Sequence, residues 1–242
     1  MIEMQEMLEI HRYQDGKIAA MQDAVVVERL VSLAINNKIT FHHSISPALY
    51  AEFAIGFLLT SGMASTFQDI SELLVHEDTI SATVRNLRIP AGCGKGAGGG
   101  LLPLDFKKSK ISLRPRQVDY ASLEGLFADF SRRSAVFRQT GGTHSAALSA
   151  GGRVVFFAED IGRHNAIDKV VGAGAMAGID LADMLLLTSG RISTEIVNKA
   201  GQVRLSGVIS HSAPTSLAVR LATQYGMRLI GFLRGNRFNI YS

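Results

Sequence analysis

The chain has little of what marks several classes of protein. It contains one cysteine, Cys93, among 242 residues, which excludes an internal disulfide, a cysteine-rich zinc module and an internal CxxC redox pair. The HExxH pattern of zinc proteases and the HxE and PCxxC pair of zinc deaminases are also absent. Glu159, Asp160 and Asp168 lie near His164 in the sequence, but not at a comparable spacing. We therefore predict no metal ligand, and any sulfur chemistry runs through one thiol.

Long hydrophobic runs and a strong excess of one charge are absent too. No apolar run reaches the ~18 residues that cross a bilayer, and residues 1–17 are acidic and polar, unlike a secretion signal. We expect a cytoplasmic protein with no membrane partner. Lys and Arg number 25 against 21 Asp and Glu, a net charge of +4, without the clustered basic stripe of a duplex binder. This balance predicts a phosphorylated small molecule as the ligand and no nucleic-acid partner.

What the chain does contain is enough apolar surface for a folded core. Hydrophobic residues make up 47% and charged residues 19%, and the length allows one large domain or two small ones. Residues 25–45 predict a β-hairpin through an Asn-Asn-Lys turn. A helix is expected to follow from an N-cap at Ser46 and Pro47 up to Gly62, and residues 70–90 predict short strands. The N-terminal half is therefore expected to be a mixed α+β unit.

From residue 119 onward, strand patterns alternate with helix patterns. Helices are expected at 121–133, 164–177, 192–201 and 214–225, and strands at 144–149, 153–159, 183–188, 206–210 and 227–232. Such alternation is typical of an α/β fold with a largely parallel sheet and helices on its faces. A charged stretch with two prolines near residues 105–118 indicates a linker. We predict an N-terminal α+β domain over 1–115 and a C-terminal α/β domain over 116–242.

Polar residues follow each strand expected in the C-terminal half after the first. Arg163, Arg191 and Arg234 come after three of these strands, and ligands of open α/β sheets bind at the carboxyl ends of strands. Glycine turns, helix N-termini and arginine side chains together favour an anionic, nucleotide-like ligand. Any single polar residue after a strand is better explained as the N-cap of the helix that follows. Capping does not explain the arginines, because a cap needs no cation and the helix macrodipole disfavours a cation at a helix N-terminus. The residues with this capping alternative are Ser193, Thr215 and Asn165.

His144 ends the segment Thr140-Gly141-Gly142-Thr143-His144, ahead of a predicted strand. A histidine can bind a ligand or act as an acid or base near neutral pH, and a capping or exposed position is an equally good expectation. A nucleotide hydrolase or deaminase with His144 or His164 as its base is a further alternative, which turnover of free nucleotides would reveal. No metal or nucleophile constellation accompanies these histidines.

Cys93 lies in a glycine-rich segment. Residues 92–100 hold six glycines in nine positions, which predicts a loop that is neither helix nor strand. A lone cysteine is usually a buried small hydrophobe, but its glycine neighbours cannot bury it and Lys95 favours the thiolate. The segment is no phosphate-binding Walker A loop, because Gly96 follows Lys95 where that motif needs Ser or Thr. We predict that Cys93 is a nucleophile or a sulfur carrier.

Several long motifs resemble one family. They are TGGTH (140–144), EDIGRHNAIDKVVG (159–172), SGRISTEIVNKA (189–200), SAPTSLAVRLA (212–222) and GFLRGNRFNIY (231–241). Together they closely resemble the FdhD family of formate dehydrogenase accessory sulfurtransferases, and SPALYAEFAIGFLLTSGM (46–63) resembles it more weakly. The resemblance implies a homodimer whose C-terminal domain is similar to cytidine deaminase without its zinc.

The resemblance also implies a function. It is that of a sulfur carrier, which takes sulfur from a cysteine desulfurase as a persulfide. The carrier passes this sulfur to the molybdenum cofactor, Mo-bis-molybdopterin guanine dinucleotide, before the cofactor enters formate dehydrogenase. GDP should then bind as a mimic of the guanosine diphosphate half of the cofactor.

Carried onto this sequence, the family's persulfide cysteine is Cys93, the expected catalytic residue. Gly96 stands where the family commonly has the second cysteine of a CxxC, which puts in doubt any step that needs a resolving thiol. A cofactor chaperone with Cys93 incidental is therefore the alternative, and persulfide formation on Cys93 distinguishes the two. The expected cofactor-binding residues are Phe232, Leu233, Arg234, Gly235, Asn236, Arg237, Arg163, His164, Ser189, Arg191 and His144.

Overall fold

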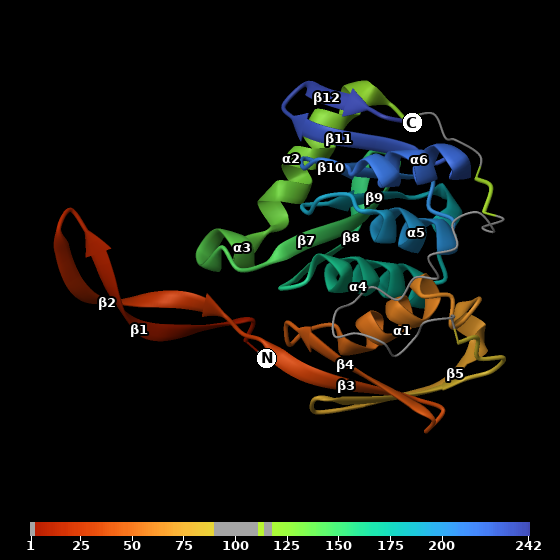
Figure 1. Cartoon of the computed structure of the whole chain (residues 1–242), viewed down its shortest axis with the longest axis horizontal. Coiled ribbons are helices and arrows are strands. Elements are labelled where there is room, and N and C mark those ends of the chain that lie inside the picture. The colour runs from red at the N-terminus through yellow and green to blue at the C-terminus, as the bar shows by residue number, and fades with distance from the viewer. Residues whose placement is uncertain (1–2, 90–110, 114–117) are drawn as a thin grey trace.

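We describe a computed structural model of the chain for residues 3–89, 111–113 and 118–242. Cys93 and the predicted loop at 92–100 lie outside the described residues, as do most of the residues of the predicted linker. The described chain forms a two-stranded, a four-stranded and a six-stranded sheet with their helices (Figure 1). No helix in these residues is long and apolar enough to cross a membrane.

The two-stranded sheet is a hairpin that the sequence analysis did not anticipate. Strands β1 (Gln5–Gln14) and β2 (Lys17–Val26) pair antiparallel along their full length. Asp15 and Gly16 between them both have positive φ, of 51° and 77°, which is the geometry of a tight two-residue hairpin turn. The hairpin extends away from the rest of the molecule (Figure 1), and its base lies against the α3 region described below.

The predicted hairpin at 25–45 is confirmed. Strands β3 (Arg29–Ile35) and β4 (Ile39–Ile45) flank the Asn-Asn-Lys turn. Strands β5 (Ile70–His76) and β6 (Thr79–Val84) complete a sheet of order β4-β3-β6-β5, in which only β3 and β6 run parallel. One face of this sheet buries Val31, Leu33 and Ile80 against a helix, α1 (Tyr50–Thr60).

The start predicted for this helix is wrong. It begins at Tyr50, after Leu49 in the left-handed region, rather than at Ser46 and Pro47. Ser46 instead has partners far away in the sequence. Its N–H donates to the Asp160 carboxylate at 3.0 Å, and its hydroxyl accepts the N–H of Ile161 at 3.1 Å. Tertiary hydrogen bonds therefore replace the local capping bond that the sequence suggests.

The C-terminal half forms the six-stranded sheet, of order β12-β11-β10-β9-β7-β8. Its strands are β7 (His144–Ala150), β8 (Arg153–Asp160), β9 (Leu185–Thr188), β10 (Gly207–Ser210), β11 (Arg228–Arg234) and β12 (Arg237–Ile240). Parallel pairing is confined to β9, β10 and β11, and β7 and β12 run opposite to the other four strands, so the expectation of a largely parallel sheet is corrected to a mixed one. Two tight turns, Gly151-Gly152 and Gly235-Asn236, send β8 and β12 back antiparallel. Strand β12 was not predicted.

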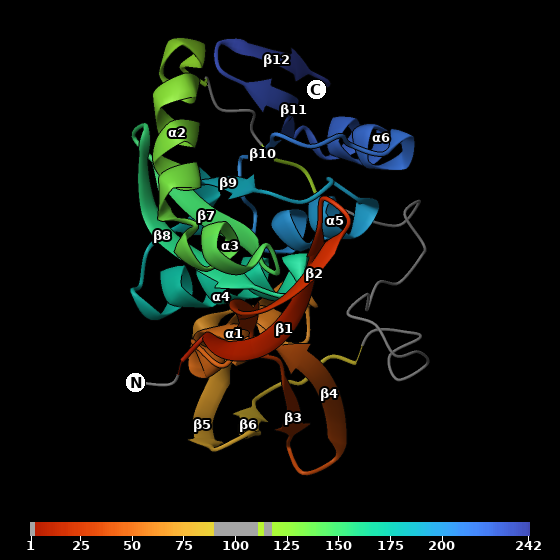
Figure 2. The ribbon, with the colours of Figure 1, turned by 90° about the vertical axis from the view of Figure 1, so that its left-hand side faces the viewer.

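Helices cover both faces of this sheet (Figure 2). Their bounds are α2 (Leu123–Arg133), α3 (Ala135–Thr140), α4 (Arg163–Met176), α5 (Thr194–Gln202) and α6 (Ser216–Tyr225). Leu186 and Val208 face the core with α4, α5 and α6, whereas Leu187 and Ile209 face α2. Successive side chains of a strand point to opposite faces of the sheet, so strands covered by helices on both sides are buried on both faces. The predicted α/β class is confirmed, while α3 was not predicted.

Helices α1 and α4 join the two larger sheets by direct backbone contact. A Cβ atom placed on Gly56 would lie 1.8 Å from the carbonyl oxygen of Asp168, and one on Gly172 would lie 1.8 Å from that of Glu52. Two buried ion pairs flank this contact. Lys169 Nζ lies 2.6 Å from Asp160, and Lys199 Nζ lies 2.7 Å from Asp168. The two aspartates considered above as metal ligands therefore have ammonium partners.

Candidate functional site

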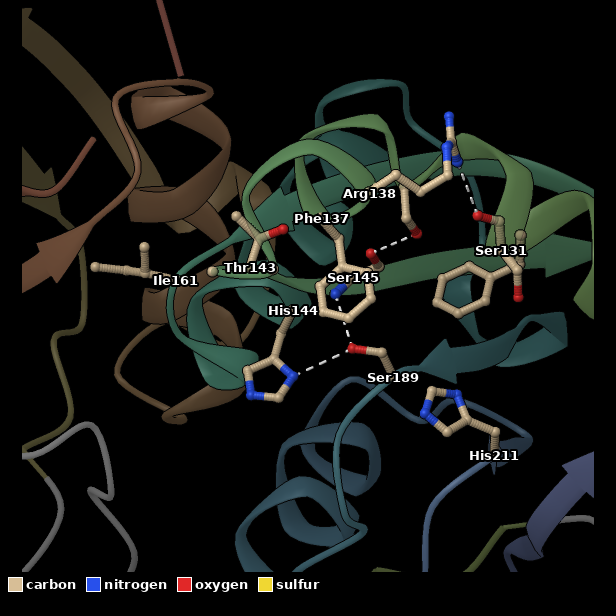
Figure 3. Close-up of a pocket in the computed structure, with 13 residues that line it drawn as sticks. Ser131, Phe137, Arg138, Thr143, His144, Ser145, Ile161, Ser189 and His211 are labelled. Atoms are coloured by element: carbon tan, nitrogen blue, oxygen red, sulfur yellow. Dashed lines mark hydrogen bonds between the residues drawn. The ribbon is translucent and has the colours of Figure 1, made fainter. Parts of the chain in front are cut away.

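A cavity of about 500 Å³ opens at one edge of the six-stranded sheet (Figure 3). Because β7 is antiparallel to β8 and β9, its first residue, His144, lies beside the carboxyl ends of those strands. The ends of β10 and β11 reach the same edge. The strand ends that the sequence singled out are therefore brought together. The lining residues are Phe130, Ser131, Ser134, Phe137, Arg138, Gly141, Gly142, Thr143, His144, Ser145, Ile161, Ser189 and His211.

His144 and Ser189 meet at the centre of this edge. The His144 Nδ1 atom is 3.2 Å from the Ser189 hydroxyl, which also accepts the N–H of Ser145 at 2.9 Å (Figure 3). The hydroxyl of Ser189 and Nδ1 of the neutral ring can each be the donor in this bond, depending on which ring nitrogen carries the proton. Burial, and then the positive charge of Arg163, lower the pKa of His144 below its ordinary value. His144 is therefore a neutral hydrogen-bonding group at neutral pH.

A buried glutamate fixes the wall of the cavity. Glu159 accepts the backbone N–H groups of Val136 and Phe137 at 3.0 and 2.8 Å, and the hydroxyl of Thr143 at 2.9 Å. These bonds hold the start of α3 and the turn before β7 at the end of β8. The side chain lies under the cavity wall and is not among the residues that line it. Glu159 therefore holds the cavity wall in position through hydrogen bonds.

The polar lining holds one arginine and two histidines. Arg138, His144 and His211 are among the described residues that line the cavity, and no Asp or Glu is among them. Burial, with the charge of Arg234 as the smaller cause, lowers the pKa of His211. Phe137 is 49% exposed and supplies aromatic surface in the same lining, whereas Phe130 lies beneath it in the core. Such a combination suits a ligand with a flat ring and an anionic group.

Arg163 and His164 border the cavity without lining it. The Arg163 side chain packs on Gly190, where a Cβ atom would lie 2.9 Å from its Cδ, and its Nε has no hydrogen-bond partner among the described residues. His164 Nε2 lies 3.2 Å from the Glu195 carboxylate. Arg191, in the turn before α5, is exposed. These residues add positive charge beside His144.

The segment from Phe232 to Arg237 reaches the same edge but does not line the cavity. Phe232 has a φ of 55° at an irregularity in the β11–β12 pairing, and its N–H donates to the carbonyl of Ser212. The side chain of Leu233 is buried with α2 in the core, so it does not face the edge. The remaining four residues, Arg234, Gly235, Asn236 and Arg237, are exposed.

Of the three possible caps, Thr215 alone caps a helix with its side chain, which accepts the N–H of Ala218. Ser193 holds the N-cap position of α5, but its buried hydroxyl has no partner among the described residues. Asn165 lies inside α4, and its amide donates to Asp160 and to the carbonyl of Ser44. Capping therefore accounts for one of the three.

Sequence reasoning missed part of the lining. Phe130 comes from α2, Phe137 from the unpredicted α3, and Ser134 from the junction between these two helices. Ser134 is hydrogen-bonded to Ser145 at 2.7 Å, a pairing that no spacing along the chain indicates. Cys93, the expected catalytic residue, lies outside the described residues.

Comparison with known proteins identifies a family. The sequence model of the FdhD/NarQ family matches residues 26–242. The Sulfur carrier protein FdhD of Bacillus subtilis strain 168 is 32% identical over 247 residues, which cover 97% of this chain and 94% of that protein. A protein of the same name from Staphylococcus aureus strain MRSA252 is 32% identical over 250 residues, covering 96% and 92%.

A solved structure shares the fold. The crystal structure of a formate dehydrogenase accessory protein from Desulfotalea psychrophila superposes with a TM-score of 0.86. The matched region covers 99% of this chain and 97% of the chain in that structure, at 24% sequence identity. At that identity the likeness concerns the arrangement of helices and strands, which is the mixed α/β architecture described above.

Proposed function

The chain belongs to the FdhD/NarQ family, and from that premise we propose that it is a sulfur carrier required for formate dehydrogenase activity. It takes sulfur onto Cys93 as a persulfide from a cysteine desulfurase. The acceptor is the molybdenum cofactor, Mo-bis-molybdopterin guanine dinucleotide, which this protein binds as a substrate before the cofactor enters formate dehydrogenase. Two relatives carry the name Sulfur carrier protein FdhD, and this chain matches more than 90% of the length of each. These names support the assignment.

The observation that carries the binding half of the proposal is the cavity at the strand edge, whose described lining holds Arg138 and two histidines and no carboxylate. Phe137 offers aromatic surface to a guanine ring, and the neutral His144 with Ser189 offers hydrogen bonds to polar ring or ribose atoms. Arg138 and the arginines at the rim offer charged hydrogen bonds to the diphosphate. Each task follows from the chemistry of the side chain and from its place in or beside the cavity.

The transfer half of the proposal depends on one thiol. No other cysteine in the chain can carry sulfur, and Lys95 two residues on favours the thiolate that attacks a donor persulfide. Cys93 bonds to the terminal sulfur of the donor persulfide, and the thiolate of the donor leaves. In the second step the acceptor supplies the electron pair that bonds to this terminal sulfur, and the Cys93 thiolate leaves as the S–S bond breaks. This cycle needs no resolving cysteine, so Gly96 at the family's second cysteine position is compatible with it.

A calorimetric titration with GDP tests the binding half. GDP should bind the full-length protein, and Arg138→Ala should weaken binding by about tenfold, because a charged hydrogen bond is lost. Arg132→Ala is the matched control, since that side chain is 74% exposed on α2 and lines no part of the cavity. Equal GDP affinities for wild type and Arg138→Ala would remove the nucleotide from this cavity.

A further inference from the structure

The hairpin of β1 and β2 has a free backbone edge along β1. The two strands pair over their full length without an irregularity in register, and among the described residues no further strand pairs with β1. The N–H of Val27 donates to the carbonyl of Met4 at 2.9 Å. Hydrogen bonding alternates along an antiparallel strand. The even-numbered residues of β1 therefore bond to β2, and the odd-numbered residues from 5 to 13 point their N–H and C=O groups outward.

Strand β1 lacks several devices that keep a free edge from pairing with another strand. Such edges are commonly blocked by proline, by a β-bulge or by lysine, and β1 contains none of these. On the face of its odd-numbered residues the hairpin exposes large apolar side chains, since Met7, Tyr13 and Ile18 are 59%, 72% and 69% exposed. A two-stranded hairpin on its own is marginally stable in water, whereas three or more strands with an apolar face can be stable. Both the edge and the face therefore favour the addition of further strands.

The charge pattern of β1 fits a second copy of the same strand. If two copies of β1 pair antiparallel, odd-numbered residues must oppose odd-numbered residues, because these have the free N–H and C=O groups. When Ile10 opposes its own copy, Met7 opposes Tyr13, and Glu9 opposes His11, which can donate a hydrogen bond to the carboxylate. No like charges then oppose each other. A shift by two residues in either direction would oppose Glu9 to Glu9 or His11 to His11, and directly opposed like charges destabilise a sheet.

We propose that two copies of this chain associate by pairing the free edges of their β1 strands, about a two-fold axis that passes between the two Ile10 residues. The two hairpins then form one four-stranded antiparallel sheet with both β1 strands at its centre. A two-fold contact of this kind uses the same surface on both copies and closes on itself. The hairpin extends away from the rest of each chain (Figure 1), so the two chain bodies lie at opposite ends of the shared sheet. The homodimer expected from the family resemblance would form through this edge, independently of the sulfur-carrier function.

Engineered cysteines test the register in the full-length protein, with Cys93→Ser as the background. Opposed residues that do not hydrogen-bond to each other have Cα atoms about 4.5 Å apart in an antiparallel pair, which is within the range of a disulfide. Ile10→Cys should therefore give a disulfide-linked dimer under mild oxidation. Leu8→Cys is the matched control on the same face of β1. It would oppose Arg12 of the partner subunit rather than its own copy, so it should give no linked dimer.

Sedimentation equilibrium of further variants tests the edge and its charges. His11→Pro removes an outward N–H of β1 and no bond to β2, so it should raise the dissociation constant of the dimer by at least about tenfold. Ala20→Pro is the matched control, because Ala20 opposes His11 within the hairpin and points its N–H to the free edge of β2; it should leave the dissociation constant unchanged. His11→Glu should also weaken the dimer, because it opposes two pairs of carboxylates. Adding Glu9→Lys to His11→Glu should restore the dimer.

Several results would overturn this interface. One is a wild type that sediments as a monomer at every concentration tested, and another is an Ile10→Cys variant that gives no linked dimer. Cross-linking of Leu8→Cys in place of Ile10→Cys would refute the register. A weaker dimer with Ala20→Pro but not with His11→Pro would move the contact to β2, and wild-type dissociation constants for both would move it away from the hairpin. A double charge variant no tighter than His11→Glu alone would refute the opposition of Glu9 to His11.

Discussion

Removing one member of the buried ion pair between α4 and α5 should cost much of the stability of the protein. Lys199 Nζ contacts both carboxylate oxygens of Asp168 at 2.7 Å and the Thr60 hydroxyl at 3.0 Å, and both charged side chains are buried. Lys199→Met keeps most of the side-chain volume but leaves the Asp168 carboxylate without its cation. An uncompensated buried charge of this kind destabilises a protein by about 3–5 kcal/mol.

The assay is thermal unfolding followed by circular dichroism. For a chain of this length, 1 kcal/mol corresponds to about 2–4 °C in Tm, so the expected drop in Tm is roughly 6–20 °C. The double variant Asp168→Leu with Lys199→Met should recover part of this loss, because neither charge of this pair then remains buried. Thr60 keeps a weak bond to the carbonyl of Phe57 in that variant.

A surface pair provides the control. Arg133 Nε lies 3.1 Å from Asp129 on α2, with both side chains partly exposed. Arg133→Met should change stability by at most about 0.5 kcal/mol. The reasoning is refuted if Lys199→Met unfolds at the wild-type temperature, or if the double variant is less stable than the single one.

Three further changes have expected outcomes. Gly172→Ala would place a Cβ atom 1.8 Å from the carbonyl oxygen of Glu52, so it should lower the free energy of unfolding by at least ~1–3 kcal/mol. Gly125 has open space around it, so Gly125→Ala should stabilise α2 slightly. Equal denaturation midpoints for the two variants would contradict the close packing of α1 on α4. Burial lowers the pKa of His43 to about 4, so as the pH falls the unfolded chain binds a proton at this group before the folded protein does. The stability that this group contributes is complete above about pH 6.5 and falls by roughly 3 kcal/mol as the pH drops to 4. His43→Leu should flatten this dependence of the free energy of unfolding on pH, and an unchanged dependence would contradict the argument. Arg234→Ala should weaken GDP binding by about one to two orders of magnitude, and calorimetry showing unchanged affinity would remove this end of β11 from the site.

Elements with a clear hydrophobic pattern could be predicted from the sequence. Strands β7 to β11 and helices α4 to α6 lie within a few residues of their expected positions. The central strands β9 and β10 are short apolar runs bounded by turn residues, and the apolar residues of α5 and α6 repeat at about 3.6 positions. The hairpin of β1 and β2 was missed, because it is exposed on both faces and its sequence carries no buried alternation. Helix α3 has six residues, too few for a period to emerge.

The site was partly predictable for a related reason. Parallel strands place their carboxyl ends at one edge, so the polar residues after β9, β10 and β11 could be grouped without a structure. That Ser46 pairs with Asp160 and Ile161 instead of capping α1 could not be predicted, since it depends on how the two larger sheets meet. The same holds for the contact between Ser134 and Ser145.

The most direct test of the central claim is intact mass spectrometry of the purified protein after incubation with a cysteine desulfurase and cysteine. The wild type should gain the mass of one sulfur atom, which dithiothreitol removes, and Cys93→Ser should gain none while still binding GDP. In a strain that lacks the native protein, the same variant should then fail to restore formate dehydrogenase activity. A wild-type protein that acquires no sulfur, or a Cys93→Ser variant that supports full activity, would contradict the sulfur-carrier account and favour a cofactor chaperone in which Cys93 is incidental.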